Sequence, residues 1–153
     1  MLFRFIWVGK TRNAELRALS EEYFKRVSRF VRAEIVEVRE CAGGSNVEGI
    51  EEEGRRIISA LRADTHVVLL DVQGSEKSSL DVANDIKHWQ NSGAKQIAFV
   101  IGGHSGVSEL AAARARATWS LSRLTFTHEM ARVLLLEQIY RGFTILNGFP
   151  YQK

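Results

Sequence analysis

The sequence contains few of the residues that build covalent or metal-based chemistry. Of its 153 residues, one is cysteine (Cys41) and one is proline (Pro150). A lone cysteine excludes an intrachain disulfide and a zinc site made of several thiolates, and it fits a reducing compartment. No apolar run approaches the ~20 residues that span a bilayer, and no basic leader or cleavage site is visible at the start. We therefore expect a soluble, unprocessed, cytoplasmic protein with no membrane partner.

The composition is that of an ordinary globular chain. Hydrophobic residues make up 45% and charged residues 25%, and no repeat or low-complexity tract interrupts the sequence. This predicts a single domain over residues 1–153. The formal net charge of +3 is compatible with an anionic partner such as RNA but does not demonstrate one.

Apolar runs of strand length alternate with helical patterns along the whole chain. The expected strands cover 2–8, 33–38 at a sheet edge, 66–71 in the sheet centre, 96–101 and 119–121. The expected helices run from a cap at Asn13 to Val27, over 47–62, from Ser78 or Ser79 to about 90, from a cap at Ser108 to about 115, and over 129–143. A flexible loop is expected at 43–45 and a turn at 73–75.

This alternation predicts an α/β fold, with a mostly parallel sheet covered by helices on both faces. In open α/β sheets, ligands bind at the carboxyl ends of the strands. Three loops belong to that edge, and they follow Asp71, Ile101 and Leu121. We therefore expect the binding chemistry to lie there.

Two of these loops have unusual sequences. The strand ending at Ile101 runs directly into Gly102 and Gly103, which allows backbone amides to approach a ligand closely. The spacing matches neither the Rossmann fingerprint nor a Walker loop, and alone it is equally typical of a tight turn. Residues 119–126 alternate apolar and small polar side chains, a pattern that can hold an adenine but also fits an ordinary strand and loop.

The last helix carries the other candidate residues. His128 and Arg132 are four residues apart and share a face, as do Glu137 and Arg141, although such pairs usually support a solvated helix face. The apolar run 133–136 indicates burial on more than one side, in a core or a subunit interface. His66, His88 and His104 lack ligand spacing with carboxylates, which argues against a metal site, and no nucleophile motif is present.

Taken together, these segments resemble one family. The chain is similar to the ribosomal large subunit methyltransferase H family, within the SPOUT superfamily of knotted methyltransferases. The similarity spans the whole chain, and the order and spacing of the motifs make it specific. The matching pieces are Leu69-Leu70-Asp71 with Gly74, Ile101-Gly102-Gly103 with Gly106, the run 119–125, the helix from His128 and Arg132 to Tyr140 and Arg141, and Pro150-Tyr151.

The resemblance implies a parallel sheet whose C-terminal third forms a trefoil knot (the alpha-beta knot), and a homodimer. It also implies a methyltransferase that uses S-adenosylmethionine. The implied substrate is N3 of a pseudouridine in the helix 69 loop of 23S rRNA, within the assembled ribosome. Carried onto this chain, the cofactor contacts would be Leu70, Gly102, Gly103, Leu121, Ser122, Arg123, Leu124, Thr125 and Phe126.

For catalysis, N3 must lose a proton, which a base or a cation stabilising the anion would assist. His128 suits the first role, and Arg132 or Arg141 the second, while Tyr140 or Tyr151 can stack on the base or bond its edge. The chain departs from the family pattern at His104-Ser105, Thr127 and Gln152. Gln152 stands where the family often has a histidine after Pro-Tyr, which argues against an essential catalytic role for a histidine in the tail.

The candidate RNA contacts are basic residues, namely Arg4, Lys10, Arg12, Lys25, Arg26, Arg29, Arg32, Arg141 and Lys153.

Other functions fit parts of the same sequence. One alternative is a SPOUT enzyme that modifies tRNA or a 2′-hydroxyl, although the short chain has no added RNA-binding domain. A second is a ribosome-associated factor without activity, which would bind ribosomes but not the cofactor. The remaining alternative is an unrelated nucleotide-binding α/β protein.

Overall fold

The structure is a computed structural model that describes residues 1–42 and 46–151. Within these residues, five strands alternate with five helices. The loop expected at 43–45, together with Gln152 and Lys153, lies outside the described residues. The strands are β1 (Leu2–Val8), β2 (Arg32–Val38), β3 (His66–Glu76), β4 (Gln96–Ile101) and β5 (Ala117–Ser120), and the helices are α1 (Ala14–Val27), α2 (Val47–Ser59), α3 (Ser79–Asn91), α4 (Glu109–Ala112) and α5 (His128–Leu146).

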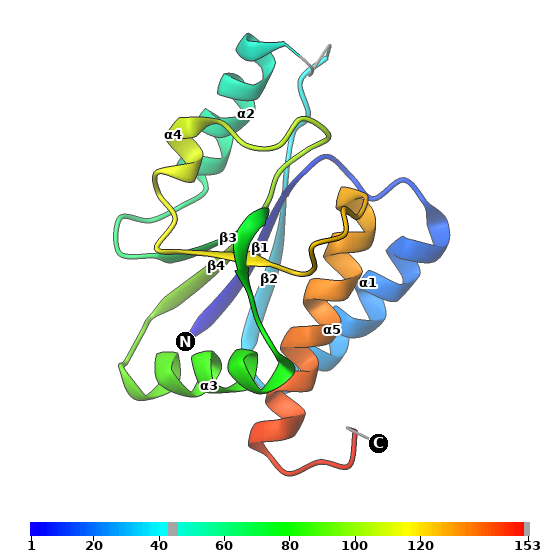
Figure 1. Ribbon diagram of the computed structural model, residues 1–153, viewed down its shortest axis with the longest axis vertical. Coiled ribbons are helices and arrows are strands. Elements are labelled where there is room, and N and C mark those ends of the chain that lie inside the picture. The colour runs from blue at the N-terminus through cyan, green and yellow to red at the C-terminus, as the bar shows by residue number, and fades with distance from the viewer. Residues whose placement is uncertain (43–45, 152–153) are drawn as a thin grey trace.

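The strands form one parallel sheet in the order β2-β1-β4-β3-β5. The steps from β1 to β2 and from β3 to β4 run in one direction along the sheet, and the other two steps run in the opposite direction. Right-handed crossovers therefore place α1 and α3 on one face and α2 and α4 on the other. Figure 1 shows α1 beside α5, and α2 beside α4, as their contacts require. The predicted α/β fold is confirmed.

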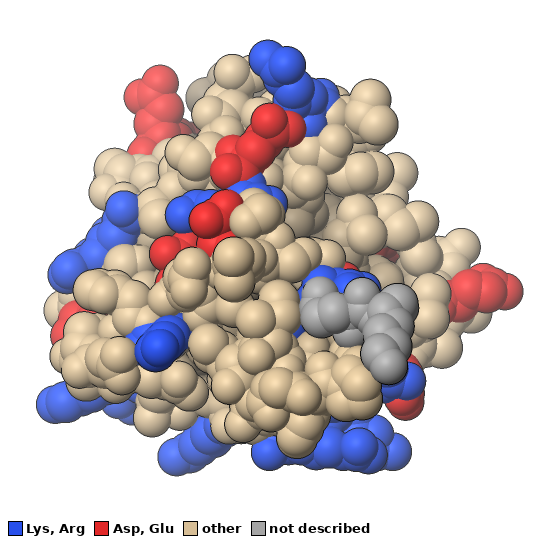
Figure 2. All heavy atoms as spheres, turned by 60° about the horizontal axis from the view of Figure 1, so that its bottom comes forward, with Lys and Arg blue, Asp and Glu red and all other residues tan. Residues whose placement is uncertain are grey.

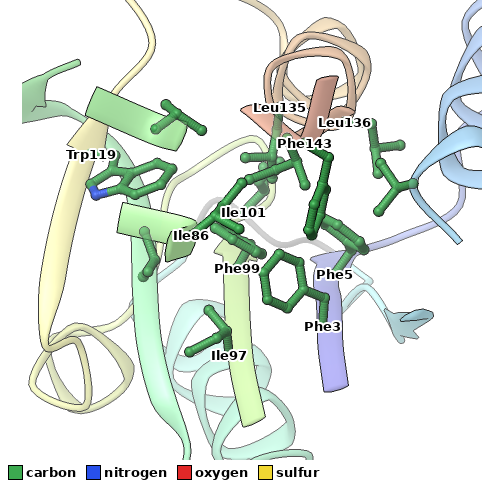
Figure 3. Close-up of a cluster of buried hydrophobic side chains, with 14 of the residues drawn as sticks. Phe3, Phe5, Ile86, Ile97, Phe99, Ile101, Trp119, Leu135, Leu136 and Phe143 are labelled. Atoms are coloured by element: carbon green, nitrogen blue, oxygen red, sulfur yellow. The ribbon is translucent and has the colours of Figure 1, made fainter. Parts of the chain in front are cut away.

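The larger core lies between the sheet and helices α1, α3 and α5 (Figure 3). Alternate residues of β1, namely Phe3, Phe5 and Trp7, point to this face, while Ile6 and Val8 point to the smaller core under α2 and α4. This alternation follows from the two-residue period of a strand. Because both faces are covered, β4 is buried along its whole length, as a central parallel strand requires.

Aromatic side chains join the strands to the helices in the larger core. The rings of Phe5 and Phe99 stack across neighbouring strands, with centroids 5.4 Å apart. On the other side of β4, Trp89 of α3 stacks on Trp119 of β5 at 5.8 Å. Such pairs add about 0.5 to 1.5 kcal/mol beyond the burial of their area. The β5 end of the sheet is thereby fixed to α3.

Helix α5 lies between α1 and α3 on the sheet. It begins one residue before and ends three residues after the predicted bounds, and Thr127 caps it by accepting the Met130 N–H. Gly142 allows the close approach to α3, because a Cβ there would lie 2.8 Å from Ile86 Cδ1. The predicted burial of this helix on more than one side is confirmed.

The turn predicted at 73–75 is wrong. Strand β3 continues to Glu76, and Leu70 and Ser75 both pair with Trp119, so that residues 71–74 form an excursion between two paired segments. Gly74 makes this possible, because a Cβ there would lie 2.6 to 2.7 Å from the backbone of Thr118 and Trp119. The strand therefore resumes after residues that have turn propensity.

Other element bounds differ by a few residues. Helix α4 ends at Ala112 and not near 115, because Arg116 already donates to the Val67 carbonyl and draws the chain into the sheet. Strand β5 accordingly begins two residues early, at Ala117. Helix α2 ends at Ser59 and not at 62, because the N–H groups of residues 60 and 61 bond to carbonyls three positions earlier and tighten the chain into turns.

No described helix is both long and apolar enough for a membrane span. The C-terminal knot stays a prediction.

Candidate cofactor site

A hollow of about 660 Å³ opens at the carboxyl edge of the sheet. Its walls come from the ends of β3, β4 and β5 and from the first turn of α5, so the three loops selected from the sequence do converge. Among the predicted cofactor residues, Arg123 is exposed and does not line the hollow. The other eight do line it, and they are Leu70, Gly102, Gly103, Leu121, Ser122, Leu124, Thr125 and Phe126.

The wall after β4 is a tight corner of main chain. The N–H of Gly106 donates to the Gly103 carbonyl at 3.1 Å, and Gly106 has a φ of +84°, which favours glycine. A Cβ at Gly102 would lie 2.5 Å from the Gly106 carbonyl oxygen. The corner can therefore fold back on itself only without a side chain at position 102.

The opposite wall, residues 121–126, is shaped by serine hydroxyls. Ser120 Oγ donates to the Ser122 carbonyl at 2.9 Å, and Ser122 Oγ accepts the Leu124 N–H at 3.0 Å. These bonds turn the chain and leave Leu124 71% exposed. Leu121 and Phe126 also line a second hollow of about 380 Å³, between this segment and the start of α3.

His128 lies on the first turn of α5 and lines the larger hollow. Burial, aided by the nearby positive charge of Arg132, lowers the pKa of His128 below its ordinary value, while Glu129 and Glu40 act in the opposite direction. The imidazole is therefore neutral at neutral pH and can accept a proton.

Arg132 does not reach the hollow. It is fully buried, and its guanidinium lies over the Trp7 ring at 5.1 Å. Nη2 donates to the Val8 carbonyl at 2.6 Å, and Nη1 donates to Thr11 Oγ1 at 2.9 Å. This guanidinium is bound to the end of β1 and to the turn after it, which keeps it from a substrate base in the hollow.

The remaining catalytic candidates lie at the other end of α5. Arg141 is thirteen residues after His128, which is about 20 Å along a helix axis. Its Nε donates to Glu137 Oε1 at 2.9 Å. Tyr151 donates to the same oxygen at 3.0 Å and packs on Tyr140, with centroids 4.8 Å apart. Within one chain, the structure therefore brings His128 to the hollow but not Tyr140, Arg141 or Tyr151.

The comparisons with known proteins bear on the whole chain. Residues 1–152 match the family model described as "Predicted SPOUT methyltransferase". This chain belongs to the SPOUT methyltransferase family. Among curated relatives, the ribosomal RNA large subunit methyltransferase H of Geotalea uraniireducens (strain Rf4) is 42% identical over 151 residues, covering 99% of each chain. The protein of the same name from Clostridium kluyveri (strain ATCC 8527) is 40% identical over 159 residues, covering 100% of each.

A solved structure has a similar fold without close sequence similarity. The crystal structure of a probable methyltransferase from Bordetella pertussis Tohama I superposes with a TM-score of 0.60. It covers 92% of this chain and 93% of its own, at 11% sequence identity. At that identity, the likeness concerns the fold alone.

In this SPOUT methyltransferase, several lining residues were not selected from the sequence. They are Asp71, Val72, Ile101, His104, Gly106, Thr127 and Ala131. Except for Ala131, which lies inside α5, they lie at or after the end of β4, in the excursion within β3, or at the cap of α5. A rule that takes every residue near those positions would have found them. Asp71 Oδ1 accepts the Gln73 N–H at 2.8 Å and so shapes the β3 excursion. In the part of the chain that the structure describes, no three His, Cys, Asp or Glu side chains are grouped as a metal would require.

Proposed function

We propose that this protein is an S-adenosylmethionine-dependent rRNA methyltransferase that acts on N3 of a pseudouridine in the helix 69 loop of 23S rRNA, on assembled ribosomes in the cytoplasm. The hollow at the carboxyl edge carries this proposal, because the loops of three strands and the neutral His128 meet there. The names of the curated relatives support the rRNA substrate.

The residues of the hollow fit the cofactor. Leu70, Leu121 and Leu124 supply apolar walls for a purine and ribose. Gly102 and Gly103 have no side chain and line the hollow, so their backbone can come close to the edge of an adenine. When bound, S-adenosylmethionine supplies the activated methyl group. The protein then contributes orientation, by holding the donor between the two walls.

His128 is the proposed proton acceptor. N3 becomes a nucleophile when it loses its proton, and a base with a pKa near or below neutrality is free to take it. His128 is half-buried beside the hollow and has a lowered pKa, so it is unprotonated at neutral pH. This role predicts that activity falls as the pH drops through the pKa of His128.

Arg141, Tyr140 and Tyr151 reach a hollow only if a second copy provides it. Tyr140 and Arg141 lie about 20 Å along α5 from His128 of the same chain, and Tyr151, beyond the end of α5, packs on Tyr140. The homodimer that the resemblance implies would supply the second hollow. We therefore propose that the protein is a homodimer and that these side chains contact the substrate bound at the partner's His128.

The candidate RNA contacts differ in how free they are. Figure 2 shows basic and acidic side chains mixed over the upper part of one face and mostly basic side chains along its lower edge. Arg4 is bound to Glu34 and to the Ala60 carbonyl, and Arg26 is paired with Glu22. Lys10 and Arg12 are exposed on the turn whose backbone bonds to Glu129, next to His128. Arg12 also pairs with Glu40 at 2.9 Å on the surface. We propose these two cations as the phosphate contacts nearest the site.

The test is methyl transfer in vitro. The purified protein, ribosomes from cells lacking its gene, and isotopically labelled S-adenosylmethionine are incubated, and the 23S rRNA is mapped by mass spectrometry. We expect one labelled methyl on one pseudouridine of the helix 69 loop. A methyl at another RNA position would favour the alternative SPOUT enzyme. Ribosome binding without heat of association with the cofactor would favour a non-catalytic factor.

A further inference from the structure

The first two turns of α5 are bound to the end of β1 and to the turn that follows it by two charged side chains. Glu129 accepts the backbone N–H of Arg12 at 2.6 Å through Oε1 and that of Asn13 at 3.2 Å through Oε2. Arg132 donates to the Val8 carbonyl and to Thr11 Oγ1. The carboxylate and the guanidinium therefore hold neighbouring parts of residues 8–13.

The end of β1 is a rigid anchor for this turn. Strand β1 pairs with β2 along its whole length, up to Val8 with Val38, and with β4 up to Trp7 with Ile101. Thr127 also holds the start of α5: its Oγ1 accepts the Met130 N–H at 3.3 Å and its carbonyl accepts the Ala131 N–H at 2.9 Å. Both of these bonds stay within α5 and its own flank and do not join the helix to β1. The position of His128, between Thr127 and Glu129, therefore depends on the two charged contacts.

We propose that Glu129 and Arg132 are positioning residues for His128, which fix the first turn of α5 to the end of β1 so that the imidazole stays at the hollow. Neither side chain touches the reacting atoms. Glu129 is committed to backbone N–H groups of residues 12 and 13, and Arg132 is fully buried. This inference rests on the proposed function for the role of His128, but not for the geometry.

The charges that act on His128 give the two residues opposite signatures. Arg132 on α5 and His104 after β4 lower the pKa of His128, and Glu129 on α5 and Glu40 after β2 raise it. Removing the Arg132 charge should therefore raise the pKa of His128, and removing the Glu129 charge should lower it. A loss of fold alone would not produce shifts of opposite sign.

The experiment compares Arg132→Met and Glu129→Gln with Arg17→Met, which removes an exposed cation from α1. The His128 pKa is measured by NMR titration of the ring C2 proton, assigned with His128→Ala, and kcat and KM are measured against pH. We expect opposite pKa shifts, and a loss of about tenfold or more in kcat from a displaced imidazole. Cofactor affinity and the control variant should stay near wild type.

The conservative variant Arg132→Lys separates charge from geometry. A lysine ammonium keeps the positive charge but lacks the planar fork of guanidinium nitrogens that donates to the Val8 carbonyl and to Thr11 Oγ1. We expect an unchanged His128 pKa with a reduced kcat, and this variant also serves if Arg132→Met fails to fold. Unchanged kcat in both Arg132→Lys and Glu129→Gln would overturn the proposal, as would pKa shifts of the same sign. If the wild-type protein transfers no methyl group, the proposed function fails, while the titrations still decide the positioning.

Discussion

Substituting Gly102 by alanine tests whether the corner after β4 closes over the methyl donor. The added Cβ would lie 2.5 Å from the Gly106 carbonyl oxygen and 2.6 Å from its carbon. Both are backbone atoms, so no side-chain rotation relieves the contact. The corner must open by about 0.9 Å to reach an ordinary separation of 3.4 Å.

A displacement of this size should weaken binding strongly while leaving the fold intact. Shifting binding groups by about 1 Å can cost up to about a hundredfold. We therefore expect the affinity for S-adenosylhomocysteine, the demethylated donor, to fall by about ten- to a hundredfold, or about 1.4 to 2.8 kcal/mol. The corner is largely exposed, so the melting temperature should change by only a few degrees.

Isothermal titration calorimetry measures the affinity, and thermal unfolding without ligand measures the stability. The control is Gly93→Ala, beyond the end of α3, where the φ of +70° makes alanine strained but no atom lies within 4 Å of the new Cβ. It should lose stability and keep its affinity for the ligand. If Gly102→Ala binds within twofold of wild type, this corner does not close over the donor.

Three further predictions concern the core, the pH dependence and the assembly. Leu136→Ala should lower the free energy of unfolding by about 2 to 5 kcal/mol, because this side chain is fully buried in the larger core; urea denaturation measures it, and a loss below about 1 kcal/mol would contradict that packing. Burial is the chief cause of the lowered pKa values of His66 and His128. The unfolded state therefore binds more protons than the folded state, so the free energy of unfolding should be highest above pH ~6.5 and decline below it. Urea midpoints at a series of pH values check this, and His66→Gln should flatten the decline. Mixing His128→Ala subunits with Arg141→Ala subunits should restore about a quarter of wild-type methyl transfer. Half of randomly reassorted dimers contain one subunit of each kind, and in such a dimer one of the two sites has both His128 and Arg141 intact. No recovery would mean that each site belongs to a single chain.

The sheet could be predicted from the sequence because its signal is local. The run 96–101 has six consecutive uncharged residues and leads directly into two glycines, and it forms the buried β4. The strand-end rule then selected loops that line one hollow, and it needed only the order of the elements. The resemblance added residue-level predictions on the same loops, of which Arg123 alone stays outside the lining.

What could not be predicted depends on contacts distant in sequence. Residues 73–75 carry turn propensity, and only pairing with β5 makes the end of β3 a strand. Arg132 shares a face with His128 by spacing, yet its partner is a carbonyl 124 positions earlier in the chain. Likewise, Tyr151 is bound by Glu137 and lies near Tyr23 of α1. Local patterns carry no information on such partners, so the sequence left open which candidates face the hollow.

The stacked pair of Trp89 and Trp119 gives the protein a built-in optical reporter. Trp119 lies two residues before the wall that begins at Leu121, and both indoles are buried. Indole emission responds to the polarity and mobility of its surroundings, so any rearrangement of that wall should alter the fluorescence of the native chain. The chain has a third tryptophan, Trp7, so replacing both Trp7 and Trp89 by phenylalanine would leave Trp119 as the only indole. Stopped-flow mixing could then follow events at the hollow without an attached dye.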